Sequence, residues 1–283
     1  MTKIYRAWLF GSRPYIAVHY MFPTAFGIFL GMNIFAKPIY LLKSIFLFLA
    51  IFFSYQASII LNDINDMKAD AFARRKTPLN TKEISIAEYR NWGIIFVTIA
   101  LGFGLLISYR MFLIVLLGNV LHFLYSSPPF RLKRFYPISI FLLSLGALLA
   151  AIAGYAIYEP SKPFISFPLK ATLFIVVPLF LGLNFRDLAD YEGDKKTEVQ
   201  TLFTVFGLDR GRIINAILIF LSYLSVPIIL QFAWLFLAAV PLGLMSLYFC
   251  LKKPFKENYI FYIYFLLILI LTVLFNLRPK LII

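Results

Sequence analysis

Nine apolar stretches alternate with short polar segments along the 283 residues. Each stretch approaches the roughly 20 apolar residues that a helix needs to cross the hydrocarbon core of a membrane. Turn and helix-end signals separate the stretches, for example Lys37-Pro38, Ser127-Pro128-Pro129 and Lys252-Lys253-Pro254. The pattern predicts nine helices, at residues 14–35, 38–61, 91–109, 111–126, 136–157, 165–185, 212–230, 232–251 and 258–277.

The composition excludes an ordinary soluble domain. Hydrophobic residues make up 61% of the chain, charged residues only 14%, and the mean hydropathy is +0.86. A soluble domain is about one quarter charged, and this chain has too few polar side chains to cover itself in water. We therefore predict an all-α, polytopic membrane protein with about nine transmembrane helices, forming a single domain over residues 1–283.

The net charge of +14 would suggest nucleic-acid binding in a soluble protein. In a membrane protein the excess has another explanation, because cytoplasmic loops collect Lys and Arg. If the N-terminus lies inside, 20 of the 27 basic residues fall on cytoplasmic segments. The distribution predicts a cytoplasmic N-terminus, cytoplasmic polar loops at 62–90, 127–135 and 186–211, a C-terminus on the opposite side, and no nucleic-acid partner.

Seven of the 13 acidic residues fall into two short runs, 62–70 after the second predicted helix and 184–194 after the sixth. If each helix continues through its run, Asn62, Asp66 and Asp70 share one helical face at i, i+4 and i+8. By the same reasoning Asp187, Asp190 and Asp194 share a face at i, i+3 and i+7. Each helix end would then present a row of oxygen ligands.

Carboxylates at this spacing repel one another, and the membrane boundary makes unpaired charges costlier. Mg²⁺ prefers oxygen ligands and is commonly bound by a few carboxylates together with substrate phosphates. The two runs therefore suggest a Mg²⁺ site that grips a diphosphate. The plain alternative is that these acids are solvated loop residues that balance the loop bases.

Three motifs resemble those of the UbiA superfamily of intramembrane prenyltransferases. Residues 62–70 match the motif N-D-x-x-D-x-x-x-D, and residues 187–194 match D-x-x-D-x-E-G-D, followed by Thr201-Leu202 and Gly207. A third signature, a Tyr-Ser pair followed by prolines and basic residues, appears as residues 125–133. The chain departs from the family at 74–79, where N-R-P-x-R-P is frequent, and at 13–16, where R-P-x-N is frequent. These departures leave the metal chemistry intact but bear on the acceptor.

The resemblance implies a helix bundle around a central cavity that binds a prenyl diphosphate, a lipophilic acceptor and two Mg²⁺ ions. It implies Mg²⁺ ligands at Asn62, Asp66, Asp70, Asp187, Asp190 and Asp194. It implies diphosphate contacts from Arg131, Lys133, Lys195, Arg74 and Arg13, with Tyr125 and Ser126 lining the chamber near the allylic carbon. We hypothesise catalytic roles for Asp66, Asp190 and Tyr125, with a motif carboxylate such as Asp66 assisting deprotonation.

The acceptor stays open at this point. The second motif is most similar to branches that act on geranylgeranylglyceryl phosphate, homogentisate or chlorophyllide, and 4-hydroxybenzoate and naphthoate are further candidates. A divalent-cation transporter is the alternative from a different functional class. It would place acidic residues along a path through the membrane-spanning segments, whereas here the acidic runs lie at one face.

Overall fold

The computed structural model describes residues 14–72, 77–159 and 166–283. In these ranges each of the nine predicted segments forms a helix, and no strand occurs. Eight of the helices are long and apolar enough to cross a membrane, and a shorter apolar helix covers Tyr20–Phe35. The helices that correspond to the nine predicted segments are α2 (Pro14–Phe35), α3 (Leu41–Phe72), α4 (Ile86–Ile107), α5 (Tyr109–Ser126), α6 (Ile138–Ala156), α7 (Leu169–Gly182), α10 (Leu208–Leu230), α11 (Phe236–Leu251) and α12 (Glu257–Leu277).

The chain divides into two compact units. Unit 1 comprises Met1–Lys133 and Gly146–Ser166, and unit 2 comprises Arg134–Leu145 and Phe167–Ile283. Helix α6 contributes residues to both. The prediction of a single domain is not tested by this division and stays a prediction, as does the central cavity that the resemblance implies.

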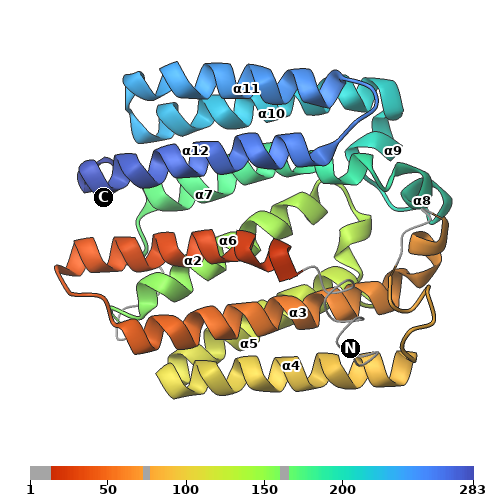
Figure 1. Cartoon of the computed structure of the whole chain (residues 1–283), viewed down its shortest axis with the longest axis horizontal. Helices are drawn as coiled ribbons and strands as arrows, with labels where there is room; N and C mark the ends of the chain where they lie inside the picture. Colours follow the sequence, from red (N-terminus) through yellow and green to blue (C-terminus); the bar gives the residue numbers. More distant parts are fainter. Residues whose placement is uncertain (1–13, 73–76, 160–165) are drawn as a thin grey trace. The chain divides into compact units, whose positions relative to one another are not determined.

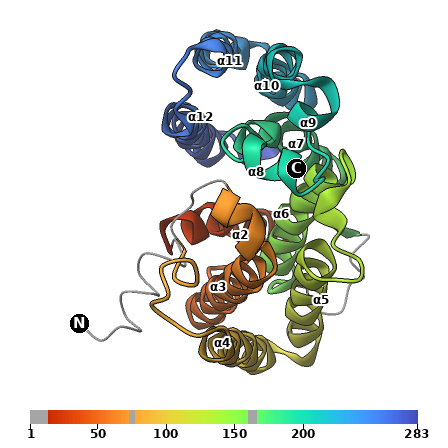
Figure 2. The same cartoon turned by 90° about the vertical axis from the view of Figure 1, so that its right-hand side faces the viewer.

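Unit 1 is organised around α3, which packs against α2, α4 and α5 (Figures 1 and 2). A buried cluster that includes Leu47, Ala100, Met111 and Ala153 joins α3 to α4, α5 and α6. Helix α4 begins at a capping box, in which the Ser85 hydroxyl accepts from the Glu88 N–H and the Glu88 carboxylate accepts from the Ser85 N–H. Ser108 both ends α4 and caps α5, so the two helices form a tight antiparallel pair.

Helices α2 and α6 approach each other at two glycines. A Cβ atom on Gly27 would overlap the carbonyl oxygen of Ala151, and a Cβ atom on Gly154 would overlap the carbonyl oxygen of Thr24. By contrast, a Cβ atom on Gly146, earlier on α6, would meet nothing within 4 Å. Small residues let the backbones of neighbouring helices in a membrane come close together, and Gly27 and Gly154 serve this purpose here.

Unit 2 contains α7, α10, α11, α12 and the first part of α6. Its short helices include η3 (Leu183–Leu188), α8 (Tyr191–Lys196) and α9 (Leu202–Phe206). Helix α10 packs against α7 and α11, and α11 packs against α12 (Figure 1). The core of unit 2 includes Phe185, Ala216, Cys250 and Ile260. The Arg212 guanidinium donates to the carbonyl oxygens of Cys250 and Lys252, at 3.4 and 3.2 Å, and so satisfies the C-terminal end of α11.

Candidate active site

The first acidic run lies on an unbroken helix, as the spacing predicted. Helix α3 continues for 32 residues, through the run to Phe72. Asn62, Asp66 and Asp70 therefore follow one another along one face at its C-terminal end. Asn62 and Asp66 are half-buried, and Asp70 is buried. The prediction that this helix continues through its run is confirmed.

The segment after α5 supplies polar and basic groups to this face of α3. The Ser126 hydroxyl donates to Asn62 Oδ1 at 2.9 Å, and the Lys133 ammonium donates to the same oxygen at 2.6 Å. The Arg131 guanidinium pairs with Asp66 at 2.8 Å, and Lys133 pairs with the other carboxylate oxygen of Asp66. Residues of two motifs that lie more than 60 positions apart in the chain thus form one group.

Two local features fix the position of Arg131. Its backbone has a φ of 41°, in the left-handed region that residues other than glycine rarely occupy. Its N–H donates to the Ser127 carbonyl at 2.8 Å, which closes a turn. Asn65 holds the same turn. Its side-chain amide donates to the Ser127 hydroxyl at 3.2 Å, and its backbone carbonyl accepts from the Arg131 guanidinium at 3.2 Å. Sequence reasoning missed Asn65, which occupies a variable position of the motif.

Asp63 was also missed as a functional position. Its carboxylate accepts from the Tyr89 hydroxyl of α4 at 3.1 Å, and both residues are buried. This bond ties the C-terminal part of α3 to α4 directly beside Asn62. The signal was present in the sequence, because Asp63 is a fixed acidic position of the motif that received no ligand role.

The group combines carboxylate and amide oxygens, which suit a metal cation, with cationic side chains, which suit an anion. The side chains of Asp66, Arg131 and Lys133 are only 15%, 17% and 10% exposed. Burial lowers the pKa of Lys133, while the charges of Asp66 and Asp70 act in the opposite direction. Carboxylate and amide oxygens are ligands that suit Mg²⁺. In this structure, cationic side chains of the protein itself lie against those oxygens.

The second acidic run does not continue an α-helix, so the prediction of a shared helical face for Asp187, Asp190 and Asp194 is wrong. Helix α7 ends at Gly182, the 3₁₀ helix η3 carries Asp187, and a new helix, α8, begins after Asp190 and carries Asp194. The physical reason lies at the start of η3. The Asn184 amide donates to the carbonyls of Phe180 and Leu181, at 3.4 and 3.2 Å, and so competes with the backbone bonds that would continue α7.

Local hydrogen bonds hold the second run together. The Asp194 N–H donates to the Asp190 carbonyl, and the Thr197 hydroxyl donates to the Gly193 carbonyl, both at 2.9 Å. Within unit 2, the Arg134 guanidinium donates to the Thr197 carbonyl at 3.3 Å, and the Arg134 carbonyl accepts from the Gln200 N–H at 2.9 Å. Tyr136 packs nearby, and its pKa is raised by burial and by the negative charge of Asp187.

The remaining predicted residues are placed as follows. Tyr125 is half-buried beside Ser126 at the end of α5. The Lys195 ammonium lies 5.9 Å from the centre of the Tyr191 ring. Arg13 and Arg74 fall outside the described residues. Within 14–72, 77–159 and 166–283, no three His, Cys, Asp or Glu side chains gather into a metal site by themselves. The full ligand set therefore stays a prediction.

The structure thus combines the fold of a multi-pass helical membrane protein with a mixed acidic and basic group at the end of α3. The sequence profile of the UbiA prenyltransferase family matches residues 20–269. The chain belongs to this family, and it is an integral, multi-pass membrane protein. The comparison confirms the resemblance inferred from the three motifs and gives no support to a cation transporter.

Relatives from two kinds of organism show similar levels of identity. A protein of Oryza sativa subsp. japonica, named as a probable homogentisate phytyltransferase 2, is 29% identical over 178 residues, which are 58% of this chain and 45% of that protein. The digeranylgeranylglyceryl phosphate synthase of Pyrococcus horikoshii is 28% identical over 186 residues, or 65% of this chain and 64% of that protein. The matches thus span about half to two thirds of the relatives' length.

A solved structure shares the fold. The UbiA homolog from Archaeoglobus fulgidus, determined with GPP and Mg²⁺ bound, has a TM-score of 0.67 over 93% of this chain and 96% of that chain. The two sequences are 22% identical. At this identity the likeness concerns the fold, and it confirms the all-α, polytopic architecture that the hydrophobic pattern predicted.

Proposed function

We propose that this protein is a Mg²⁺-dependent prenyltransferase that moves a prenyl group from a polyprenyl diphosphate to a lipophilic acceptor within the membrane. The observation that carries the proposal is the group formed by Asn62, Asp66, Ser126, Arg131 and Lys133. It combines oxygen ligands for a metal with cations for a diphosphate, at the end of a membrane-spanning helix. Family membership supports the reaction type.

Arg131 and Lys133 would exchange partners when substrate binds. In the structure, both cations contact Asp66. A diphosphate carries more negative charge than one carboxylate, so the guanidinium and the ammonium can turn to its oxygens and stabilise the charge that grows as it leaves. Ser126 donates to the same Asn62 oxygen as Lys133, so Ser126 and its neighbour Tyr125 would line the space near the allylic carbon.

The oxygens released by this exchange suit a hard cation. We propose that Asn62, Asp66 and Asp70 would hold one Mg²⁺ and that Asp187, Asp190 and Asp194 would hold a second. Mg²⁺ bound there would neutralise the phosphate charge. Lys195, Arg74 and Arg13 are proposed as further diphosphate contacts.

The chemistry needs one bond to break and one to form. The C–O bond between the allylic carbon and the diphosphate breaks, and the leaving group keeps the electron pair. The acceptor's nucleophilic atom bonds to the allylic carbon and loses a proton, for which we propose Asp66 or another motif carboxylate. Apolar and aromatic walls exclude water, which would otherwise capture the developing allyl cation.

We propose an acceptor among lipophilic aromatic or lipid precursors. The rice relative bears the name of a homogentisate enzyme, and the archaeal one bears the name of an enzyme that makes a glyceryl phosphate lipid. We also propose that the N-terminus and the motif loops face the cytoplasm and that the C-terminus lies on the other side, because 20 of 27 basic residues then fall inside.

Diphosphate release by the purified protein in nanodiscs tests the proposal. The assay would use geranylgeranyl diphosphate with homogentisate or with geranylgeranylglyceryl phosphate, in Mg²⁺ or in EDTA. We expect release that depends on one acceptor and on Mg²⁺, and that is lost in Asp66→Asn. The control is Asp209→Asn, because Asp209 is 85% exposed and pairs only with the surface residue Lys253 among the described residues.

Release that persists in EDTA, or in Asp66→Asn at the rate of the control, would refute the role of the first motif. Release without any acceptor would indicate hydrolysis of the prenyl diphosphate and would contradict prenyl transfer.

A further inference from the structure

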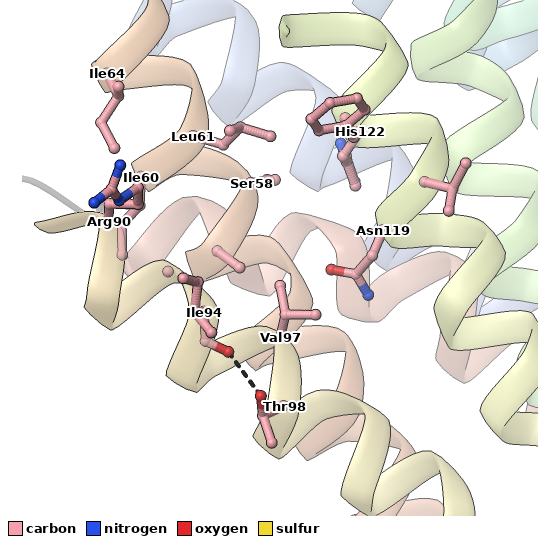
Figure 3. Close-up of a pocket in the computed structure, with 14 residues that line it drawn as sticks. Ser58, Ile60, Leu61, Ile64, Arg90, Ile94, Val97, Thr98, Asn119 and His122 are labelled. Atoms are coloured by element: carbon pink, nitrogen blue, oxygen red, sulfur yellow. Dashed lines mark hydrogen bonds between the residues drawn. The ribbon is translucent and has the colours of Figure 1, made fainter. Parts of the chain in front are cut away.

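A groove lies within unit 1, between α3, α4 and α5 (Figure 3). Its volume is about 380 Å³, within the range of small-ligand sites. Its walls are mostly apolar, and several wall residues, including Ile94, Val120 and Phe123, are more than 40% exposed. Because all three helices are candidate membrane spans, the exposed side of this groove meets lipid.

Most of the groove's wall on α3 faces away from the candidate active site. Ile60 and Ile64 line the groove, and they stand two positions before and two positions after Asn62, about 200° around the helix from it. Ser58, four positions before Asn62, lies on the same face as Asn62 and forms the edge of the groove nearest the candidate active site.

Two polar groups lie toward the same end of the groove. Helix α4 begins at Ile86, so Arg90 lies about one turn after its start, and α5 ends at Ser126, so His122 lies about one turn before its end. Ser108 connects the two helices at their other ends. Figure 3 shows both polar groups at one end of the groove, with Thr98 at the other. Among the described residues neither side chain has a hydrogen-bond or ion-pair partner.

The charge at this end indicates what the groove holds. A polar side chain within a membrane span is costly unless it meets a partner. Here an exposed guanidinium and an imidazole lie at one end of a mostly apolar groove, whose other polar lining residues are Ser58, Thr98 and Asn119. The distance along α4 from Arg90 to Thr98 is eight residues, or about 12 Å, which is less than half of the roughly 30 Å hydrocarbon core. The groove is therefore long enough for the part of one acyl chain nearest the head group, within one leaflet.

We propose that this groove binds one anionic phospholipid. The phosphate accepts hydrogen bonds from Arg90 and from the imidazole N–H of His122, and one acyl chain lies along Ile94, Val97 and Val120 toward Thr98. A neutral or zwitterionic lipid would fill the same apolar space, but its head group lacks the net negative charge that matches Arg90. The inference rests on the membrane fold and does not depend on the proposed reaction.

Native mass spectrometry of the detergent-purified protein tests this, with phosphatidylglycerol and phosphatidylcholine as probes and no prenyl substrate present. We expect phosphatidylglycerol to bind more tightly than phosphatidylcholine. Arg90→Gln should weaken phosphatidylglycerol binding about fivefold, the factor expected for one cation at an anionic lipid surface. His122→Leu should weaken it less, and Val120→Trp, which fills the groove, should reduce both lipids.

The matched control is Arg210→Gln, which removes an exposed arginine from the first turns of α10 in unit 2. It should bind phosphatidylglycerol as the wild type does. Equal loss in Arg90→Gln and Arg210→Gln would show attraction by overall charge and would overturn the proposal, as would unchanged binding in both Arg90→Gln and Val120→Trp. Diphosphate release by Arg90→Gln is expected to stay at the wild-type level, so failure here is distinguishable from failure of the proposed reaction.

Discussion

The two acidic motifs are built differently. The first lies on one long helix, and its carboxylate at Asp66 is engaged by Arg131 and Lys133 from a distant part of the sequence. The second is divided among η3, Asp190 and the six-residue helix α8, and the bonds within it join near neighbours in the chain. The first motif receives ion pairs from a distant part of the sequence, whereas the second is shaped by backbone hydrogen bonds and by bonds from Arg134 to the residues that follow it.

This difference bears on what a charge change in the first motif would do. Arg131 and Lys133 both lie against Asp66, so their positive charges offset the repulsion among the acids of this motif. Charge changes in the first motif should therefore alter folding stability as well as activity.

The largest expected effect comes from Asp66→Asn and Asp190→Asn. Both should lower acceptor-dependent diphosphate release by about 10²–10³-fold, because each removes a carboxylate proposed to hold the Mg²⁺ that would stabilise the leaving group. Asp66→Asn leaves two poorly exposed cations without their carboxylate, which we expect to cost about 2 to 3 kcal/mol of folding stability, while the exposed control Asp209→Asn should cost less than about 1 kcal/mol. Thermal unfolding in detergent measures the two losses of stability, and equal losses would contradict the role of Asp66 in pairing with Arg131 and Lys133.

Lys133→Met should have the next largest effect, on substrate affinity. It removes a charged hydrogen-bond donor to the diphosphate, so the KM for prenyl diphosphate should rise about tenfold. Stability should change little, because Asp66 keeps Arg131 and Asn62 keeps Ser126. Lys253→Met is the matched control, since Lys253 is 70% exposed. A large loss of stability with an unchanged KM would mean that Lys133 is a structural residue.

Tyr89→Phe tests the bond that braces α3 from α4. Removing the hydroxyl that donates to buried Asp63 should lower stability by about 1.5 kcal/mol. Activity should fall only modestly, because no atom of Tyr89 is proposed to touch substrate. Tyr262→Phe on α12 serves as the control, because Tyr262 is 64% exposed. If both variants unfold at the same temperature, Asp63 is not held through this bond.

The smallest effect is expected from Thr201→Val, which tests the local character of the second motif. The Thr201 hydroxyl caps α9 by accepting from the Thr204 N–H at 3.3 Å. Its loss should cost about 1 kcal/mol, without the change in KM expected for Lys133→Met. Thr272→Val provides a comparison at an exposed threonine on α12. A KM change as large as that of Lys133→Met would show that α9 acts on the substrate site directly.

Much of the fold could be predicted from the sequence because membrane spans are set by a local property, the length of an apolar run. The continuation of α3 through Asn62, Asp66 and Asp70 was predictable for a similar reason, since their spacing matches the helical repeat. The break after Gly182 was not. It depends on where the Asn184 side chain finds its hydrogen bonds, and the same residue is compatible with a continuing helix.

The site was predicted in part. The motifs identified Ser126, Arg131 and Lys133 as residues that act together, but nothing in their spacing indicated that they contact Asn62 and Asp66 without substrate. That pairing depends on how α5 packs against α3. The same limit explains why Asn65 and Tyr89 were missed, because their roles arise from tertiary neighbours and not from a sequence pattern.

The close approach of α2 and α6 constrains how this protein can change over time. Gly27 faces the backbone at Ala151, and Gly154 faces the backbone at Thr24, so a larger residue at either position must push the same two helices apart. The first such substitution would cause nearly the whole loss of stability, because it separates the two helices. A second substitution would then cost little, because the helices are already apart. The two glycines should therefore be exchanged together or not at all, and in a set of descendants of this sequence they would vary as a pair.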